Sequence, residues 1–332
     1  MTDARRELTR DDLTPLARAA VGRTRRLAGV SRLRGGTKKG VYRLAFDDDT
    51  TAVAYVWSPD EDYWSSGPVD DRDPFSHASG IDLFTASYDR LTAVGIRTPR
   101  LLFADRTHAH LPADAAVVED IRGGSLEELL HRDPEAAAAP LRELSEALRT
   151  MHAHRAPRFG KVALVDNGGV PQGSSCEQVV RDRALSDLAE AAGREDRIAA
   201  VREALHDLLH TLAAAVGPRT HHTLIHGELG PDHVLVDANG HPALIDIEGL
   251  LYFDAEWEHV FLRQRFQEHY EALRVDGLDA DRLRLYRLAM HLSLVAGPLR
   301  LLDVGDFPDP ASMRGIAEHS LEQTLTLLRT AS

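Results

Sequence analysis

The stretch HGELGPDHVLVDANGHPALIDIEG spans residues 226–249 and decides how the rest of the chain is interpreted. Two short apolar runs flank a tight turn, and around them stand six side chains suited to metal binding or proton transfer: His226, Glu228, Asp232, His233, Asp246 and Glu248. Asn239-Gly240 between apolar runs is the strongest short signal for a β-hairpin, because both positions of a two-residue turn need positive φ.

The hairpin brings two of these side chains together. A two-residue turn would pair Val234 with Ile245 and, one step further, would place His233 opposite Asp246. Directly opposed residues have Cβ atoms roughly 4.5–5.5 Å apart. A neutral imidazole and a carboxylate at that distance can hold one divalent cation. We therefore predict His233 and Asp246 as metal ligands; the alternative is a surface hairpin with solvated polar ends.

Composition limits the function classes. The chain has 332 residues, 43% hydrophobic and 27% charged, which suits a globular protein with one large domain or two lobes. Its net charge of -13 argues against a nucleic-acid partner, which would require a basic face. Cys176 is the only cysteine, so a reducing compartment is expected. Because the N-terminus lacks an apolar signal region and no run approaches the roughly 20 apolar residues of a membrane span, we expect a cytoplasmic protein without a membrane partner.

The element pattern predicts an α+β fold. Strands are expected at 29–33, 41–46, 51–57, 100–105 and 115–121, and helices at 11–27 and 81–93. From Ser125, whose capping box with Glu128 begins a helix, the pattern is mainly helical, including 178–216 and 255–330. The only strands expected in this second half are those of the opening stretch. We predict a β-rich lobe over 1–120 and a larger helical lobe over 121–332.

A glycine-rich loop between two predicted strands suggests phosphate binding. In Arg34-Gly-Gly-Thr-Lys-Lys-Gly40, backbone N–H groups can approach a phosphate, and two of the three lysines of the chain add positive charge. A small antiparallel lobe with such a loop, followed by a helical lobe with a carboxylate hairpin, is the arrangement that phosphoryl transfer from a nucleotide uses.

These motifs resemble the aminoglycoside phosphotransferase family of the protein-kinase-like superfamily. The family pattern HGDLHPGNVLV followed by IDWE stands here as HGELGPDHVLV followed by IDIEG, and its loop GGTSNxxYRV stands as GGTKKGVYRL. VVEDIRGGSL resembles the family hinge, and ALRTMHAH the helix before the catalytic loop. The resemblance covers roughly residues 27–266. It implies a two-lobed protein-kinase-like fold with a small antiparallel-sheet N-lobe and a larger, mainly helical C-lobe.

The resemblance also implies roles for single residues. Glu228 stands where the family has the catalytic aspartate, which orients the attacking hydroxyl, and His226 would brace that loop. His233 and Asp246 would bind the metal. The backbone of Glu119 to Ile121 would meet the nucleotide base. The phosphates would be met by the glycine-rich loop, with Gly35, Gly36, Lys38 and Lys39 as the residues expected to bind them.

Three departures from the family pattern matter. Glu228 adds a methylene to the catalytic carboxylate, and His233 replaces an asparagine, as macrolide phosphotransferases also do. The third strand carries Tyr55 where the family has a lysine that binds phosphate, and Phe84 falls where that lysine's helix glutamate is expected. Phosphate charge must then be met elsewhere, and the candidates are Lys38, Lys39 and Arg43.

The predicted function is transfer of the γ-phosphoryl group of ATP or GTP, with Mg²⁺ or Mn²⁺, to a hydroxyl of a small antibiotic-like or other natural-product molecule. The alternative is a catalytically weak or inactive kinase-like binding protein. Trp257, Glu258 and His259, in DAEWEHVF, are interpreted as structural residues that brace the helical lobe.

Overall fold

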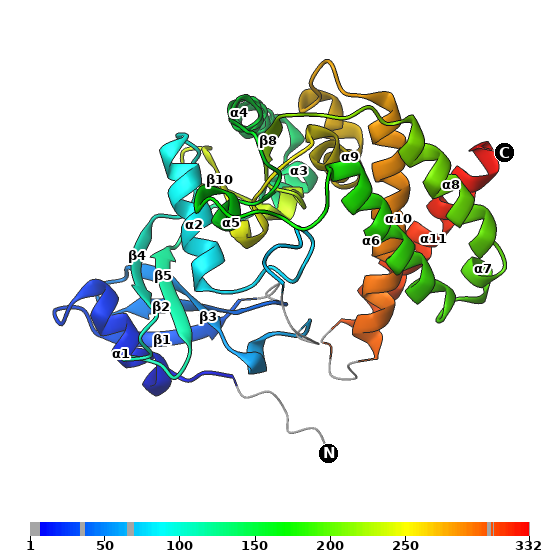
Figure 1. The fold of residues 1–332 in the computed structure, drawn as a ribbon. Coiled ribbons are helices and arrows are strands. Elements are labelled where there is room, and N and C mark those ends of the chain that lie inside the picture. Colours follow the sequence, from blue (N-terminus) through cyan, green and yellow to red (C-terminus); the bar gives the residue numbers. More distant parts are fainter. Residues whose placement is uncertain (1–6, 34–36, 65–69, 304–306, 308, 332) are drawn as a thin grey trace. The chain divides into compact units, whose positions relative to one another are not determined.

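The structure is a computed structural model that describes residues 7–33, 37–64, 70–303, 307 and 309–331 (Figure 1). Its contacts divide the chain into two compact units. Unit 1 comprises Met1–Val69, His77–Thr150 and Pro231–Gly249, and unit 2 comprises Asp70–Ser76, Met151–Gly230 and Leu250–Ser332. Hence the hairpin of residues 231–249 belongs with the N-terminal sheet, although residues 120–230, about a third of the chain, lie between them in sequence. The lobe boundary predicted at residue 120 stays a prediction.

Unit 1 is built on a five-stranded antiparallel sheet. Its strands are β1 (Leu27–Arg32), β2 (Gly40–Phe46), β3 (Thr51–Trp57), β4 (Leu101–Asp105) and β5 (Asp114–Glu119), in the order β1-β2-β3-β5-β4. β2 alternates strictly between buried and half-buried residues, as expected for a strand with one face on a core. α1 (Arg10–Val21) packs on that face, joining Leu13 and Leu16 to a core that includes Tyr42 and Leu44.

The remaining elements of unit 1 support the hairpin. They are η1 (Pro59–Glu61), α2 (Ile81–Ala93), α3 (Leu126–Arg132), α4 (Pro134–Ala153), η2 (Pro231–His233), β9 (Val234–Val236), β10 (Pro242–Leu244) and η3 (Ile247–Gly249). α4 passes into unit 2 at residue 151. The Ser125–Glu128 capping box predicted for α3 is present. α2 contacts η3, and α3 contacts η2 and β9, so two helices fix the two ends of the hairpin.

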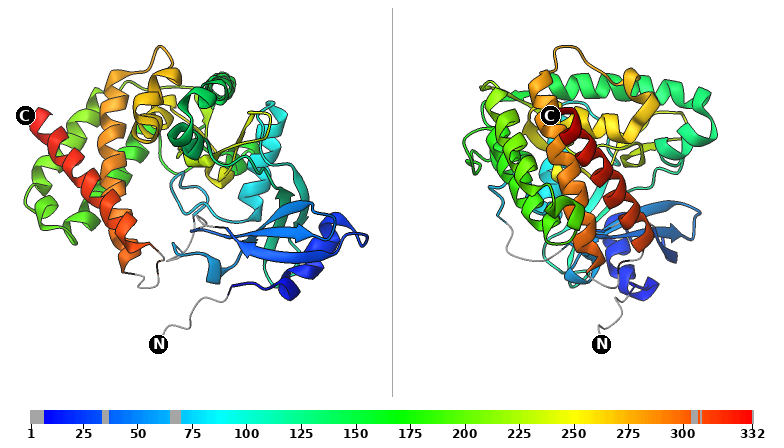
Figure 2. Two further views of the ribbon diagram at one scale, coloured as in Figure 1. Left: turned by 180° about the vertical axis from the view of Figure 1, so that it is seen from behind. Right: turned by 90° about the vertical axis from the view of Figure 1, so that its right-hand side faces the viewer.

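Unit 2 is mainly helical around a small four-stranded sheet. The sheet has the order β6-β8-β11-β7 and is formed by β6 (Arg155–Ala156), β7 (Gly160–Lys161), β8 (His222–Ile225) and β11 (Leu251–Phe253). The helices are α5 (Val162–Asp166), α6 (Cys176–Ala192), α7 (Asp196–Ala199), α8 (Arg202–Ala215), α9 (Ala255–Phe266), η4 (Gln267–Ala272), α10 (Ala280–Leu302) and α11 (Pro310–Ala331). α10 lies between α6 and α11 and carries much of the core (Figure 2).

The α+β class is confirmed, and two details were wrong. The first helix ends at Val21 rather than near residue 27, because Gly22 with φ 86° stops it. The 178–216 region is helical as predicted and contains three helices. The second half also contains β6, β7 and β11, whose two- and three-residue lengths give no readable alternation. Among the described residues, no helix is both long and apolar enough to cross a membrane.

Candidate functional site

The predicted hairpin forms with a register one residue away from the expected one. β9 and β10 pair Val234 with Leu244, one position short of the predicted partner. The cause is the turn, because the backbone N–H of Asp237 donates to the carbonyl of His241 at 3.1 Å and so closes a three-residue loop. Gly240 takes the left-handed position of that loop, with φ 86°, as in hairpins made of a type I turn followed by one left-handed residue.

His233 and Asp246 nevertheless lie side by side. His233 Nε2 is 4.0 Å from Asp246 Oδ2. Asp246 has φ 59°, a left-handed conformation that is uncommon and costly for a residue with a side chain. Because this conformation breaks the direction of β10, the alternation of the strand no longer dictates where the Asp246 side chain points. The structure thus brings the two residues together by backbone strain rather than by strand register; their role as metal ligands stays a prediction.

The ammonium group of Lys39 lies between two carboxylates of the hairpin. Lys39 Nζ is 2.8 Å from Asp246 Oδ1 and 2.6 Å from Glu248 Oε1. The side chains of Lys39 and Glu248 are 7% and 4% exposed, so this ion pair is shielded from water. Burial alone would raise the pKa of Asp246, but Lys39, His233 and Lys38 outweigh it and hold the pKa well below its usual range. Asp246 is therefore ionised at any physiological pH.

The net charge and the possible metal-ligand atoms of the group formed by Lys39, Asp246 and Glu248 can accommodate one more cation. Lys39 carries one positive charge against the two negative charges of Asp246 and Glu248, which leaves one negative charge unbalanced. Glu248 Oε2 is buried and has no hydrogen-bond partner among the described residues. An imidazole nitrogen and carboxylate oxygens are suitable ligands for a divalent cation that completes its shell with phosphate and water oxygens. The residues present therefore fit a divalent metal.

The segment after β5, predicted to meet a nucleotide base, is held from two sides. Asp120 accepts hydrogen bonds from Arg43 Nε at 2.7 Å and from Arg43 Nη2 at 3.1 Å. Arg43 is therefore paired with Asp120 rather than available as a phosphate ligand. A Cβ on Gly123 would lie 1.9 Å from the carbonyl oxygen of Val236, so only glycine lets the segment lie against β9. The backbone contact of Glu119 and Ile121 with a base stays a prediction.

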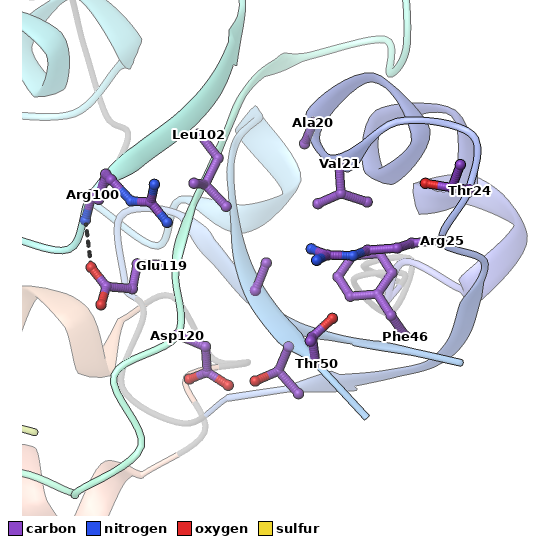
Figure 3. Close-up of a pocket in the computed structure, with 12 residues that line it drawn as sticks. Ala20, Val21, Thr24, Arg25, Phe46, Thr50, Arg100, Leu102, Glu119 and Asp120 are labelled. Atoms are coloured by element: carbon purple, nitrogen blue, oxygen red, sulfur yellow. Dashed lines mark hydrogen bonds between the residues drawn. The ribbon is translucent and has the colours of Figure 1, made fainter. Parts of the chain in front are cut away.

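A separate cavity of about 460 Å³ opens on the α1 side of the sheet (Figure 3). Its lining includes Val21, Arg25, Arg100, Glu119 and Asp120. Neither Lys39 nor Asp246 lines it. The cavity therefore borders the segment after β5 without being part of the Lys39–Asp246 group.

The structure describes part of the predicted phosphate-binding loop. Gly35 and Gly36 lie outside the described residues. Lys38 is half-buried, and its carbonyl accepts a hydrogen bond from Ser79 Oγ at 2.9 Å, which ties the end of the loop to the segment before α2. Its charge contributes to the low pKa of Asp246.

Glu228 belongs to unit 2, where it projects from a buried loop. His226, Gly227, Leu229 and Gly230 are buried, whereas Glu228 is exposed. Beneath this loop, Glu258 of α9 is 0% exposed, and its Oε2 accepts the backbone N–H of His226 at 2.5 Å. A loop whose backbone is held from below, with one carboxylate facing outward, suits a residue that must meet a substrate.

The sequence matches the phosphotransferase enzyme family over residues 42–291, about three quarters of the chain. The chain belongs to this family. No curated protein shows significant similarity to the sequence.

Solved structures confirm the predicted protein-kinase-like fold of this family member. Aminoglycoside phosphotransferase APH(4)-Ia is similar with a TM-score of 0.62 and 17% identity, over 95% of this chain and 99% of that chain. Spectinomycin phosphotransferase APH(9)-Ia, in complex with ADP and spectinomycin, has a TM-score of 0.62 and 13% identity over 96% and 98%. Choline kinase LicA from Streptococcus pneumoniae has a TM-score of 0.61 and 13% identity over 96% and 99%.

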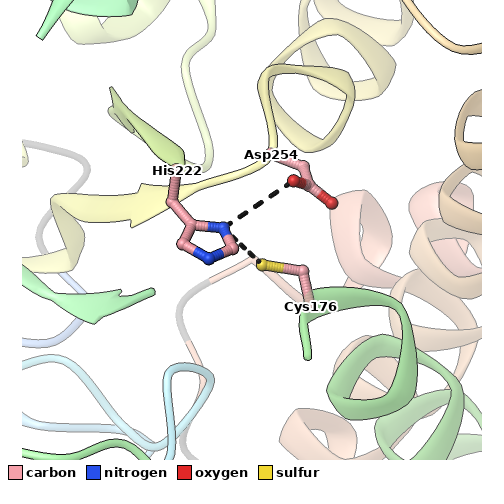
Figure 4. Close-up of side chains that lie close together, drawn as sticks. All are labelled: Cys176, His222 and Asp254. Atoms are coloured by element: carbon pink, nitrogen blue, oxygen red, sulfur yellow. Dashed lines mark hydrogen bonds and ion pairs between the residues drawn. The ribbon is translucent and has the colours of Figure 1, made fainter. Parts of the chain in front are cut away.

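A second polar cluster of this family member is buried in unit 2. His222 Nδ1 is 3.3 Å from Cys176 Sγ and 3.9 Å from Asp254 Oδ1 (Figure 4). Although these three residue types can bind metals, Asp254 is already paired with the guanidinium groups of Arg282 and Arg219. Hydrogen bonds and ion pairs of this cluster join α6 and β8 to Arg282 of α10. Burial raises the pKa of the Cys176 thiol well above its usual value.

The sequence indicates no role for Glu248 beyond its place among the six polar side chains of residues 226–249, and only a general bracing role for Glu258. Both have large apolar neighbours in the sequence, Glu248 in IDIEGLL and Glu258 in EWEHVF. A carboxylate that is buried beside such neighbours is costly without a partner, and that cost is the signal that could have identified both.

Proposed function

We propose that the protein is a small-molecule O-phosphotransferase that moves the γ-phosphoryl group of ATP or GTP to a substrate hydroxyl. The observation that carries this proposal is the ionised Asp246 carboxylate between the Lys39 ammonium and the His233 imidazole, in a chain of the phosphotransferase family. A carboxylate paired with a phosphate-binding cation is the feature that nucleotide-dependent transfer requires.

His233 and Asp246 would hold Mg²⁺ or Mn²⁺, which when bound offsets the charge of the phosphates. Lys39, with Lys38 beside it, neutralises phosphate oxygens. The backbone of Glu119 and Ile121 receives the base, and the phosphate-binding role proposed for Gly35 and Gly36 concerns residues outside those that the structure describes.

The exposed carboxylate of Glu228 orients the attacking hydroxyl and accepts its proton. In a loose transition state, the position of this carboxylate matters more than its basicity. In-line attack then breaks the bond between the γ-phosphorus and the bridging oxygen and leaves the nucleoside diphosphate.

The substrate class that we propose is a hydroxyl-bearing natural product of antibiotic type. Support comes from structural neighbours that were solved with hygromycin B, with spectinomycin and with kanamycin. A net charge of -13 also favours cationic substrates over anionic ones. Cys176 is buried and forms no disulfide, which suits a protein of the cytoplasm.

One observation favours a second function, a kinase-like binding protein with little or no activity. Tyr55 is buried in the strand position where the family has its phosphate-binding lysine. A protein that no longer transfers phosphate has no need of that lysine.

Thermal unfolding with nucleotide, with and without Mg²⁺ or Mn²⁺, separates the two functions. A ligand at 100 times its Kd should stabilise the protein by about 2.7 kcal/mol. We expect ATP or GTP to raise the Tm only slightly in the absence of metal, and to raise it more when Mg²⁺ or Mn²⁺ is present. A screen of hydroxyl-bearing natural products, with the phosphorylated product detected by mass, then tests catalysis. Nucleotide binding without any product would favour the binding protein, and no nucleotide binding would overturn the proposal.

A further inference from the structure

The position of the missing strand lysine is occupied by an aromatic cluster. Tyr55 of β3 and Phe84 of α2 stand where the lysine and its helix glutamate were expected, and their ring centroids are 5.6 Å apart. Trp57 packs 5.5 Å from Phe84 in the same cluster. The two expected members of the ion pair are therefore replaced by apolar packing, and this part of the sheet contributes no charge of its own.

Lys39 brings an ammonium group to this cluster from the position just before the neighbouring strand. It precedes β2, and its Nζ lies 5.3 Å from the centroid of the Tyr55 ring. That distance is within the range of a cation–π contact. The positive charge thus lies next to the residue that has replaced the strand lysine, while it also contacts Asp246.

Glu248 holds Lys39 in this position. Its Oε1 accepts hydrogen bonds from Lys39 Nζ at 2.6 Å and from Trp57 Nε1 at 3.3 Å. A small space of about 10 Å³, lined by Tyr55, Phe84, Asp246 and Glu248, borders the pair. Because Trp57 fixes Glu248 and Glu248 fixes Lys39, the ammonium is positioned even when Asp246 turns to another cation.

We infer that Lys39 and Glu248 form the phosphate-binding ion pair of this protein, in place of the strand lysine and helix glutamate of its family. The inference rests on the proposed function and makes it specific. Lys39 is the phosphate-binding cation, and Glu248 is a positioning residue that acts through it. When a nucleotide binds with its metal, Lys39 keeps Glu248 and exchanges Asp246 for phosphate oxygens.

The first experiment compares triphosphate and adenosine affinity by titration calorimetry in the parent and in Lys39→Met. Loss of one charge-assisted hydrogen bond should weaken triphosphate binding by about 10-fold or more. Adenosine binding should change by less than about 2-fold, because adenosine has no phosphate. Lys38→Met should lose clearly less triphosphate affinity than Lys39→Met. Arg26→Met, which removes an arginine side chain that is 82% exposed, is the matched control for loss of a positive charge.

Two further variants keep the test valid if Lys39→Met unfolds because Glu248 is left buried and unpaired. Lys39→Met/Glu248→Gln removes both charges and should fold, with the same selective loss of triphosphate affinity. Lys39→Met/Tyr55→Lys returns an ammonium group from the strand. Its triphosphate affinity should recover to within about 3-fold of the parent, a deficit smaller than the loss of one charge-assisted hydrogen bond would cause.

Three outcomes would overturn the inference. One is unchanged triphosphate binding in both Lys39→Met and Lys39→Met/Glu248→Gln. The second is equal loss of adenosine binding, and the third is no recovery with Tyr55→Lys. If the parent binds nucleotide but these results appear, the proposed function stands and only this inference fails. If the parent binds no nucleotide, both fail.

Discussion

The carboxylate of Glu258 supports the backbone of the loop that carries Glu228, through the hydrogen bond that its Oε2 accepts from the N–H of His226 at 2.5 Å. Glu258 is 0% exposed, and burial raises its pKa to about 7, although the backbone N–H groups of His226, Gly227 and Leu229 oppose the shift. The loop is therefore held by a carboxylate that changes charge near neutral pH.

This pKa predicts how stability depends on pH. Between the usual pKa of 4.5 and about 7, the folded protein binds more protons at Glu258 than the unfolded chain, so stability decreases as pH rises through this window. The effect is of the order of 3 kcal/mol. Glu258→Gln should make the slope of Tm against pH less negative between pH 5 and 7, measured by thermal unfolding, whereas the exposed control Glu203→Gln should not. An unchanged slope in Glu258→Gln would contradict the assignment.

A buried histidine should act in the opposite direction. Burial lowers the pKa of His291 to about 3, so the unfolded chain binds the extra proton below pH 6.5 and stability is lost as pH falls from there. We expect His291→Gln to lose less stability than the parent between pH 6.5 and 4, measured by urea unfolding at each pH. Exposed His221→Gln serves as the control. Equal losses in the parent and His291→Gln would show that other groups dominate acid unfolding.

Asp246→Asn tests the metal site. The substitution keeps the size of the side chain but removes the charge that faces Lys39 and His233, so metal-dependent nucleotide binding should be lost while the fold survives. The measurement is the Tm shift produced by nucleotide with and without Mg²⁺ or Mn²⁺. Asp89→Asn, an exposed position on α2, is the matched control. A parent-like metal-dependent shift in Asp246→Asn would place the metal elsewhere.

Glu228→Gln tests the catalytic carboxylate. The variant keeps the side-chain size and removes the charge, so nucleotide and metal binding should remain nearly intact while turnover falls by at least about 10²-fold. Glu228→Asp restores the family residue without the local spacing and should retain part of the activity. Rates are measured with a substrate accepted in the product screen, and Glu203→Gln again controls for loss of a carboxylate. Parent-like turnover in Glu228→Gln would falsify the assignment.

Much of the fold could be predicted because its signals are local. The Val, Tyr and Phe content that indicated the strand at 41–46 and the capping box of Ser125 and Glu128 are each contained within a few residues. The helix at 81–93 was predicted with its observed bounds. The family motifs are also local, which is why the sequence alone indicates the family and its protein-kinase-like fold.

The hairpin shows where local reasoning is insufficient. Asn239-Gly240 correctly indicated a turn, but the dipeptide does not specify whether two or three residues form the loop, and that single residue shifts the register. His233 and Asp246 met for another reason, the left-handed backbone of Asp246. Contacts with the surrounding structure impose such strain, so the alternation of apolar and polar residues in the adjacent strand does not reveal it.

By itself, the sequence determined the fold class, the family and the residue types that phosphate and metal chemistry require. Only the tertiary structure decided which lysine meets Asp246, since Lys39 and its partner are 207 positions apart. The same holds for Glu248, which Lys39 and Trp57 contact from the N-terminal sheet. A buried charge is stable only where its partner lies within a few ångströms, and that distance is set by the packing of distant segments rather than by their order along the chain.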